Sequence, residues 1–286
     1  MKPLFYLITL IPISLVRSAV NTYTRFSLHT ISKIYKLTLR NLEISFPRML
    51  EGDRKILATQ SFEETIISVY ETLQSWSRPI HLSGKKIFRV ENNFLFRQEI
   101  NQANGLAIIA IHNRSVDMLL KWINATTTTT TIYKKVKIKS LDKFVRKQRE
   151  QNNNEVYETD MYGVRKIFKA FKDNKVICLA ADQVPQRGMG EYIKLFNTEA
   201  YTTTLAASMV YKTRKPAIYM CINSFQNNYL GITIRPSKNN IYSDSEHKLS
   251  LNQSIEELIK INLKDYSWEY KRFRRSPSGI DPYGDI

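Results

Sequence analysis

Short apolar runs alternate with amphipathic segments along most of the chain. The runs with the length and composition of strands span residues 87–90, 106–111, 176–181, 217–222 and 230–236, and a threonine-rich run at 126–133 ends as a further strand. Segments with apolar positions at helical spacing span 53–76, 94–103, 115–123, 141–151, 161–172, 204–211 and 251–263. Strands interleaved with helices are typical of βαβ units. The pattern therefore predicts an α/β fold, with a mostly parallel central sheet flanked by helices.

The apolar run 106–111 leads directly into His112, and Asp117 follows five positions later at the start of a predicted helix. Open α/β sheets place their chemistry outside the carboxyl ends of the strands. An imidazole suits a general base near neutral pH, and a carboxylate can fix its tautomer. His112 and Asp117 are therefore candidate catalytic residues. The structural alternatives are a hydrogen-bonded turn histidine and a first-turn acid that complements the helix dipole.

A second predicted strand, 176–181, also ends in polar residues, Asp182 and Gln183, and a loop rich in turn formers follows. Asp182 is a candidate for orienting a substrate or a cationic group at this edge. A turn-capping acid is an equally good interpretation of the same position.

The first part of the chain has the features of a membrane-docking segment. Residues 4–16 are apolar but are interrupted by Pro12, and about 20 apolar residues are needed to span a bilayer. Residues 23–37 mix aromatic and apolar positions with Arg25 and Lys33, as in an amphipathic helix that lies in the interface. We expect an N-terminal helical membrane-docking segment over residues 1–45 and one further domain over 46–286. A secretory signal and a plain core helix are the rival interpretations.

The composition limits the classes of partner that the protein can have. The 286 residues carry 43 Lys and Arg against 26 Asp and Glu, a net charge of +17, which calls for an anionic partner such as nucleic acid, an acidic membrane, a phosphorylated substrate or an acidic carrier protein. No nucleic-acid-binding motif accompanies the charge. Cys178 and Cys221 lie in apolar runs, typical of buried residues in a reducing compartment. No Cys-x2-Cys or His-x3-His pair indicates a metal, and no Gly-x-Ser-x-Gly indicates a serine nucleophile.

Five sequence blocks occur in an informative order: RNL with FP at 40–47, His-x4-Asp at 112–117, GVR with DQ at 163–165 and 182–183, LF…A…T at 195–204, and YSW…RFR…P at 266–277. In this order they resemble the late acyltransferases of lipid A biosynthesis, with lauroyl and myristoyl branches, within the lysophospholipid acyltransferase superfamily. The similarity covers nearly the whole chain. Asn197 stands where the family has a small residue, and Gly279 lies one place late.

The resemblance implies a function. A fatty acyl chain would pass from an acyl carrier protein thioester to a hydroxyl of a lipid A precursor, in lipopolysaccharide biosynthesis at the cytoplasmic face of the inner membrane. His112 would be the general base and Asp117 would hold its imidazole. We expect no metal, no cofactor beyond the acyl-acyl carrier protein co-substrate, and no nucleic acid; the expected partners are acyl carrier protein, the lipid A precursor and the membrane.

The acceptor implied by the resemblance carries phosphates, which arginine binds well. Arg149 and Arg165 match arginines of the family pattern and are candidate substrate-binding residues together with Asp182 and Gln183; solvated helix faces are the alternative for both arginines. Three other functions stay open. The glycerol-phosphate or lysophosphatidate branch shares His-x4-Asp, although its downstream phosphate motif is missing here. Other glycolipid acyltransferases share the blocks. A non-catalytic basic membrane-binding protein would explain the charge but leaves the two polar strand ends unexplained.

Overall fold

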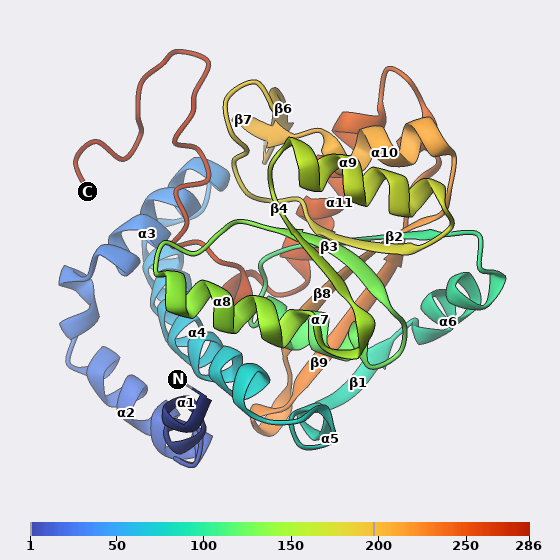
Figure 1. Ribbon diagram of the computed structural model, residues 1–286. Helices are drawn as coiled ribbons and strands as arrows, with labels where there is room; N and C mark the ends of the chain where they lie inside the picture. Colours follow the sequence, from blue (N-terminus) through green and yellow to red (C-terminus); the bar gives the residue numbers. More distant parts are fainter. Residues whose placement is uncertain (1, 197) are drawn as a thin grey trace.

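Within residues 2–196 and 198–286, which the computed structural model describes, seven strands form one sheet through the centre of the molecule (Figure 1). The order is β1-β9-β8-β2-β5-β3-β4, and all neighbours are parallel except β8 and β9. The strands are β1 (Ile87–Glu91), β2 (Leu106–Ala110), β3 (Thr129–Tyr133), β4 (Glu155–Glu158), β5 (Val176–Ala180), β8 (Ala217–Ser224) and β9 (Leu230–Pro236). A separate antiparallel hairpin consists of β6 (Gly190–Leu195) and β7 (Thr198–Thr203).

Helices cover both faces of this sheet (Figure 1). The α-helices are α1 (Lys2–Ile8), α2 (Ile13–Arg25), α3 (Lys33–Ser45), α4 (Glu51–Ser77), α5 (Ile80–Ser83), α6 (Asn93–Gln102), α7 (Val116–Asn124), α8 (Lys139–Arg149), α9 (Met161–Lys172), α10 (Leu205–Thr213) and α11 (His247–Ile261). Short 3-10 turns are η1 (Leu28–Ile31), η2 (Gly84–Lys86), η3 (Gln151–Asn153), η4 (Gln226–Asn228), η5 (Asn239–Tyr242) and η6 (Leu263–Asp265). The expectation of an α/β fold with a mostly parallel, helix-flanked sheet is confirmed.

The alternation of side chains along β2 explains why the run is apolar throughout. Ala107 and Ile109 belong to the core that includes α9, α10 and α11, whereas Leu106 and Ile108 belong to the core that includes α6 and α7. Successive strand residues point to opposite faces of a sheet. Because helices cover both faces, both sets are buried, and the strand reads as a continuous apolar run.

The carboxyl ends of β2 and β5 lie side by side. The two strands pair in register, with Ala110 opposite Ala180, and the Ala181 amide donates a hydrogen bond to the Ala110 carbonyl oxygen (3.1 Å). The next strands along the chain go to one side of β2, while β8 and β9 go to the other. Such a switch point is where open α/β sheets bind ligands. His112 and Asp182 each follow their strand by two positions, so the topology brings them together.

The expectation of one amphipathic helix over residues 23–37 is wrong. The chain instead forms α2, the turn η1 and α3. Ser27 adopts a left-handed backbone conformation (φ 56°), and the Ser32 hydroxyl accepts a hydrogen bond from the Ile34 amide (3.2 Å) as the N-cap of α3. The left-handed turn at Ser27 ends the first helix, and the Ser32 side chain starts the next because it offers the backbone an alternative to a helical hydrogen bond.

The third helix belongs structurally with the core. Tyr35, Leu37 and Leu42 of α3 are buried in the same apolar cluster as residues of α4, α10 and α11. The large exposed apolar side chains of the N-terminal region lie on the earlier elements instead, with Phe26 70% and Ile31 79% exposed. Among the described helices, none combines the length and the hydropathy that crossing a bilayer requires.

Two other parts of the sheet region were not foreseen. The polar stretch after α8 continues into the edge strand β4, and the turn-rich stretch after Asp182 contains the β6–β7 hairpin. Asn197, noted above as a departure from the family pattern, lies outside the described residues. At Gly163 in the GVR block, a Cβ atom would lie 1.9 Å from the Glu158 carbonyl oxygen. Only glycine therefore allows the first turn of α9 to approach the end of β4 so closely.

Candidate active site

His112 and Asp182 form the polar centre at the carboxyl edge of the sheet. The imidazole Nδ1 lies 2.7 Å from Asp182 Oδ1, and the backbone amide of His112 donates to Asp182 Oδ2 at 2.9 Å. The Asp182 side chain is only 2% exposed, whereas that of His112 is 28% exposed. One buried carboxylate therefore fixes both the ring and the backbone of the histidine, which remains accessible.

The charges at this pair favour a protonated Nδ1. Burial alone would lower the pKa of His112, but the Asp182 carboxylate, through its charge and its hydrogen bond, raises the pKa above its ordinary value. Burial would raise the pKa of Asp182, and the imidazole holds it below its ordinary value. Residues 2–196 and 198–286 provide no hydrogen-bonding partner for His112 Nε2. The ring therefore presents Nε2 as its free nitrogen.

The expected contact between Asp117 and the imidazole is not the one found. Asp117 instead forms a two-point ion pair with Arg149 of α8, with Nε to Oδ1 at 2.7 Å and Nη2 to Oδ2 at 3.0 Å. Burial would raise the pKa of Asp117, but Arg149 keeps it below its ordinary value. Asp117 also interacts electrostatically with His112, so it lies near the ring without holding it. The carboxylate that holds the imidazole comes from the neighbouring strand.

Arg114, inside the same motif, anchors the loop that carries His112. Its guanidinium is buried and contacts the carboxylates of Glu64 and Glu71 on α4, and it lies 3.6 Å from Asp265 Oδ1. Burial would lower the pKa of Arg114, but Glu71, Asp265 and Glu64 raise it above its ordinary value. A buried cation of this kind needs such partners, because leaving it unpaired in the interior costs several kcal/mol.

The backbone of the motif is fixed as firmly as the Arg114 side chain. Arg114 has a left-handed conformation (φ 49°), which is unusual for a residue other than glycine and is typical of functional sites. Its amide donates to the Asp265 carbonyl oxygen at 2.9 Å, and the Ser267 amide donates to the His112 carbonyl oxygen at 3.0 Å. The C-terminal segment after α11 therefore runs beside the motif and holds it.

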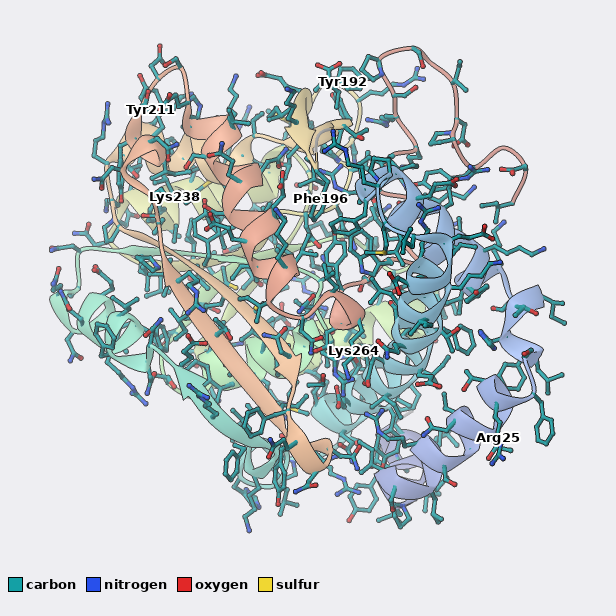
Figure 2. All side chains as sticks on the ribbon, turned by 180° about the vertical axis from the view of Figure 1, so that it is seen from behind. Arg25, Tyr192, Phe196, Tyr211, Lys238 and Lys264 are labelled. Carbon is teal, nitrogen blue, oxygen red and sulfur yellow. The ribbon has the colours of Figure 1, made fainter. Side chains whose placement is uncertain are left out.

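This C-terminal segment contains the YSW block and joins distant parts of the chain. Figure 2, seen from behind, shows η6 with Lys264 beside α4, and Lys264 Nζ lies 3.6 Å from Glu64 Oε1. Asn41 of the RNL block donates to the carbonyl oxygens of Trp268 (2.6 Å) and Tyr270 (2.9 Å). The RNL block near the start of the chain and the YSW block near its end thus contact each other.

Arg165 and Gln183 are the two other predicted site residues. Arg165 is exposed in the first turns of α9, and Gln183 is half-buried beside Asp182; neither forms a side-chain hydrogen bond or ion pair with a described residue. Sequence reasoning missed Arg114 and also Glu269, which interacts electrostatically with His112 and whose pKa burial raises. The signal for Arg114 was its place within the motif; Glu269 stands between recognised positions of the last block and gave no signal.

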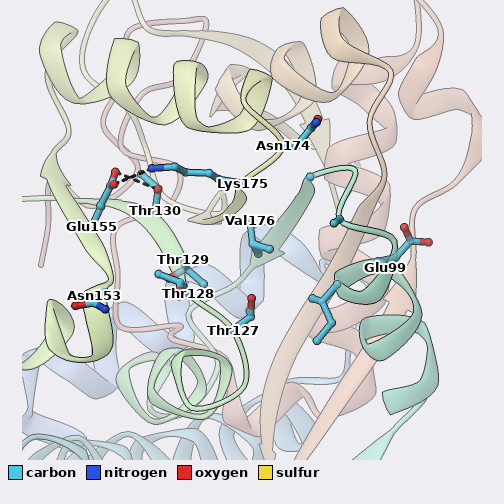
Figure 3. A pocket seen from close by; sticks show the side chains of 13 residues that line it. Glu99, Thr127, Thr128, Thr129, Thr130, Asn153, Glu155, Asn174, Lys175 and Val176 are labelled. Carbon is cyan, nitrogen blue, oxygen red and sulfur yellow. Dashed lines mark hydrogen bonds and ion pairs between the residues drawn. The ribbon is translucent and has the colours of Figure 1, made fainter.

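A cavity of about 350 Å³ lies at the opposite edge of the sheet, around the amino ends of β2, β3, β4 and β5 (Figure 3). Threonines 127–130 and Asn153 line it, and Lys175 Nζ pairs with Glu155 Oε1 across its rim (2.9 Å). Because His112 follows the carboxyl end of β2, this cavity is not part of the histidine site. Among residues 2–196 and 198–286, no group of three or more His, Cys, Asp and Glu side chains is arranged to hold a metal ion.

Sheet and site together define an α/β enzyme with an imidazole–carboxylate pair at the carboxyl edge of its strands. A sequence profile described as "Bacterial lipid A biosynthesis acyltransferase" matches residues 3–275, and the chain belongs to this family. Acyl transfer in lipid A biosynthesis is accordingly its class of activity, with a lipid A precursor as substrate. This assignment favours the lipid A branch over the glycerol-phosphate branch and over a non-catalytic membrane-binding protein.

Three relatives are similar in sequence to this protein over most of its length. It is 21% identical over 262 residues to the lipid A biosynthesis lauroyltransferase of Escherichia coli (strain K12), covering 90% of this chain and 84% of that protein. It is 22% identical over 252 residues to a lipid A biosynthesis acyltransferase of Haemophilus influenzae, covering 85% and 78%. It is also 21% identical over 243 residues to the lipid A biosynthesis palmitoleoyltransferase of Escherichia coli (strain K12), covering 84% and 78%.

The Arg114 cluster predicts a large effect on stability. Replacing Arg114 by Met leaves Glu71 buried without its cation, while Glu64 keeps its ion pair with Arg17, so the free energy of unfolding is expected to fall by about 3–5 kcal/mol. Urea denaturation followed by circular dichroism measures this. Arg146→Met is the matched control, because Arg146 pairs with Glu150 at the surface and such pairs contribute about 0–1 kcal/mol. Equal losses in the two variants would contradict the anchoring role of Arg114.

Proposed function

We propose that the protein transfers a fatty acyl chain from an acyl carrier protein thioester to a hydroxyl of a lipid A precursor, with His112 as general base. The observation that carries this mechanism is the 2.7 Å contact between His112 Nδ1 and the buried Asp182, which leaves Nε2 without a partner among the described residues. A base must reach the proton it removes, and a partly exposed ring with a free nitrogen meets that requirement.

The reaction needs one proton relay. Nε2 removes the hydroxyl proton as the hydroxyl oxygen attacks the thioester carbonyl carbon, and Asp182 stabilises the imidazolium that forms. When the tetrahedral intermediate collapses, the carbon–sulfur bond breaks, and the imidazolium returns the proton to the departing thiolate. The thioester is already activated, so no acyl-enzyme is required. Both cysteines are buried, and burial raises the pKa of each thiol to about 12, which makes either a poor nucleophile.

We assign Asp117 to orienting Arg149. The ion pair uses Nε and Nη2 of the guanidinium, which leaves Nη1 for an anionic group of the substrate. Arg165 lies on α9, which begins just after β4 at the same edge of the sheet as His112. Arg149 and Arg165 therefore remain the candidate ligands for phosphate on the acceptor, with Asp182 and Gln183 bordering the same edge.

We further propose that the protein works at the cytoplasmic face of the inner membrane, docked through α1, α2 and η1. The acceptor is a membrane lipid, and this part of the chain exposes large apolar side chains, including Leu7 (61%), Phe26 (70%) just after α2, and Ile31 (79%). Arg25 lies on the outside of α2 (Figure 2), where it can contact anionic headgroups. Because α3 packs into the core, the docking part of residues 1–45 reduces in this proposal to those before Lys33.

Replacing His112 by Ala is expected to lower kcat by about 10²- to 10⁴-fold, because positioned base catalysis contributes about that much. The measurement is mass spectrometry of a tetra-acylated lipid A precursor incubated with an acyl carrier protein thioester, scored for the gain of one acyl chain. Lysophosphatidate and glycerol phosphate serve as control acceptors. Near-normal turnover in a folded variant would refute the assignment of the base. Transfer only to the control acceptors would refute the substrate.

The pH dependence of kcat/KM tests which carboxylate, that of Asp182 or that of Asp117, is the partner of the imidazole. Because Asp182 raises the pKa of His112, and the base must be neutral to act, kcat/KM should fall on the acid side with an apparent pKa above that of an ordinary histidine. Asp182→Asn should move this limb to lower pH. The control is Asp117→Asn combined with Arg149→Gln, which removes two opposite charges and should move the limb less. A larger shift in the control than in Asp182→Asn would contradict the assignment of Asp182 as the imidazole's partner.

Charge reversal tests the phosphate ligands. Arg165→Glu should raise the KM for the acceptor by about tenfold or more and leave the KM for the donor unchanged, because an exposed carboxylate would repel the acceptor phosphates. Because Arg165 is exposed, the substitution is expected to leave the fold intact, and thermal denaturation checks this directly. An unchanged acceptor KM would mean that Arg165 is only a solvated residue on α9.

A further inference from the structure

A basic patch covers the outer side of α8 and the loop that precedes it. All of its members are exposed, and they are Lys134, Lys135, Lys137, Lys139, Lys143, Arg146 and Lys147. The only acidic residue among positions 134–149 is Asp142, which is buried and accepts hydrogen bonds from Tyr133 Oη (3.2 Å) and the Val136 amide (2.8 Å). Every exposed charged side chain of this segment is therefore cationic.

Three lysines of the basic patch form a stripe along the helix. Lys139, Lys143 and Lys147 are four positions apart, so they lie on one face of α8 and extend over about 12 Å. Like charges at this spacing destabilise a helix. None of the three forms an ion pair with any residue in 2–196 or 198–286, whereas Lys135 and Arg146 do, with Glu158 and Glu150. The stripe therefore adds repulsion that the protein itself does not relieve.

The other side of α8 connects the stripe to the histidine site. Phe144 packs against the ring of Phe5 on α1 (centroids 5.5 Å apart), and α8 contacts α7. Figure 1 shows α8 along the outside of the molecule, with the sheet behind it. Its last residue, Arg149, binds Asp117, which interacts electrostatically with His112. A partner on the basic patch would thus sit next to the site.

We propose that the basic patch is the docking surface for an acidic acyl carrier protein that delivers the thioester to His112. This proposal rests on the proposed function, which requires a protein-borne donor. Complementary charge is the observation that selects the partner, because unpaired surface lysines steer and orient an acidic protein. A lipid surface fits less well. The basic patch exposes one large apolar side chain, Ile138 (61%) just before α8, whereas many exposed apolar side chains gather on α1, α2 and η1.

The test reverses the charge of the three lysines in the stripe. The variant Lys139→Glu/Lys143→Glu/Lys147→Glu is compared with Lys169→Glu/Lys172→Glu/Lys212→Glu, which makes the same charge change at exposed positions of α9 and α10. Two quantities are measured for each: the KM and kcat with an acyl carrier protein thioester as donor, and co-sedimentation with vesicles of phosphatidylethanolamine and phosphatidylglycerol.

The proposal predicts that the stripe variant has a KM for the donor raised by about tenfold or more, a kcat within about twofold of wild type, and unchanged vesicle binding. The control variant should keep the wild-type KM. An unchanged KM in the stripe variant overturns the proposal, as does an equal rise in the control. Loss of vesicle binding in the stripe variant alone would show that the basic patch binds lipid instead. Failure of the wild-type protein to use the carrier thioester refutes the proposed function, a result distinct from all of these.

Discussion

A single buried guanidinium determines how the loop that carries His112 is built. Arg114 lies inside the protein, and its charge is tolerable there only because Glu64 and Glu71 from α4 and Asp265 from η6 surround it. The constraint brings together a helix, the motif loop and the C-terminal segment, which are far apart in the sequence. It also accounts for the left-handed backbone at Arg114, because a conformation of this kind persists only where its surroundings enforce it.

The imidazole is positioned by strand pairing, and its partner is chosen by the same pairing. Parallel strands in register place residues two positions beyond their ends next to each other, so His112 meets Asp182 across the edge of the sheet. The carboxylate five positions after the histidine begins a helix that leads away from the ring, and it pairs with Arg149 instead. The His-x4-Asp spacing thus serves two neighbouring functions in this proposal, a base and an arginine that faces the substrate.

Local sequence pattern was sufficient for most of the fold. Apolar runs and helical periodicity identified the strands and helices that frame the site, because both faces of the sheet are covered and the buried strands are apolar throughout. Polar strands such as β4 carry no such signal, and their existence depends on a neighbour for pairing. The N-terminal region was misjudged because its apolar pattern continues through Ser27 and Ser32, where the backbone breaks.

The sequence predicted where the site lies, but not which of its residues contact each other. Both polar strand ends were identified from the sequence, but their pairing depends on which strands are neighbours, and periodicity does not report strand order. Glu64 and Glu71 lie within an amphipathic helix, where an acidic residue is ordinarily solvated, so their burial depends on a cation that is distant in sequence. Local sequence patterns do not determine which charged residues pair when they are far apart in the sequence.

The central claim is that Asp182 fixes the protonation of the His112 ring, and nitrogen NMR tests it most directly. The measurement is the ¹⁵N chemical shifts of the ring nitrogens, with the His112 signals assigned by their loss in His112→Ala. Above its pKa, the account predicts a protonated Nδ1 and an unprotonated Nε2, with Nδ1–H donating to Asp182. An unprotonated Nδ1 with the proton on Nε2 would contradict the account, because Nε2, the nitrogen not occupied by Asp182, would then already carry a proton and could not act as base.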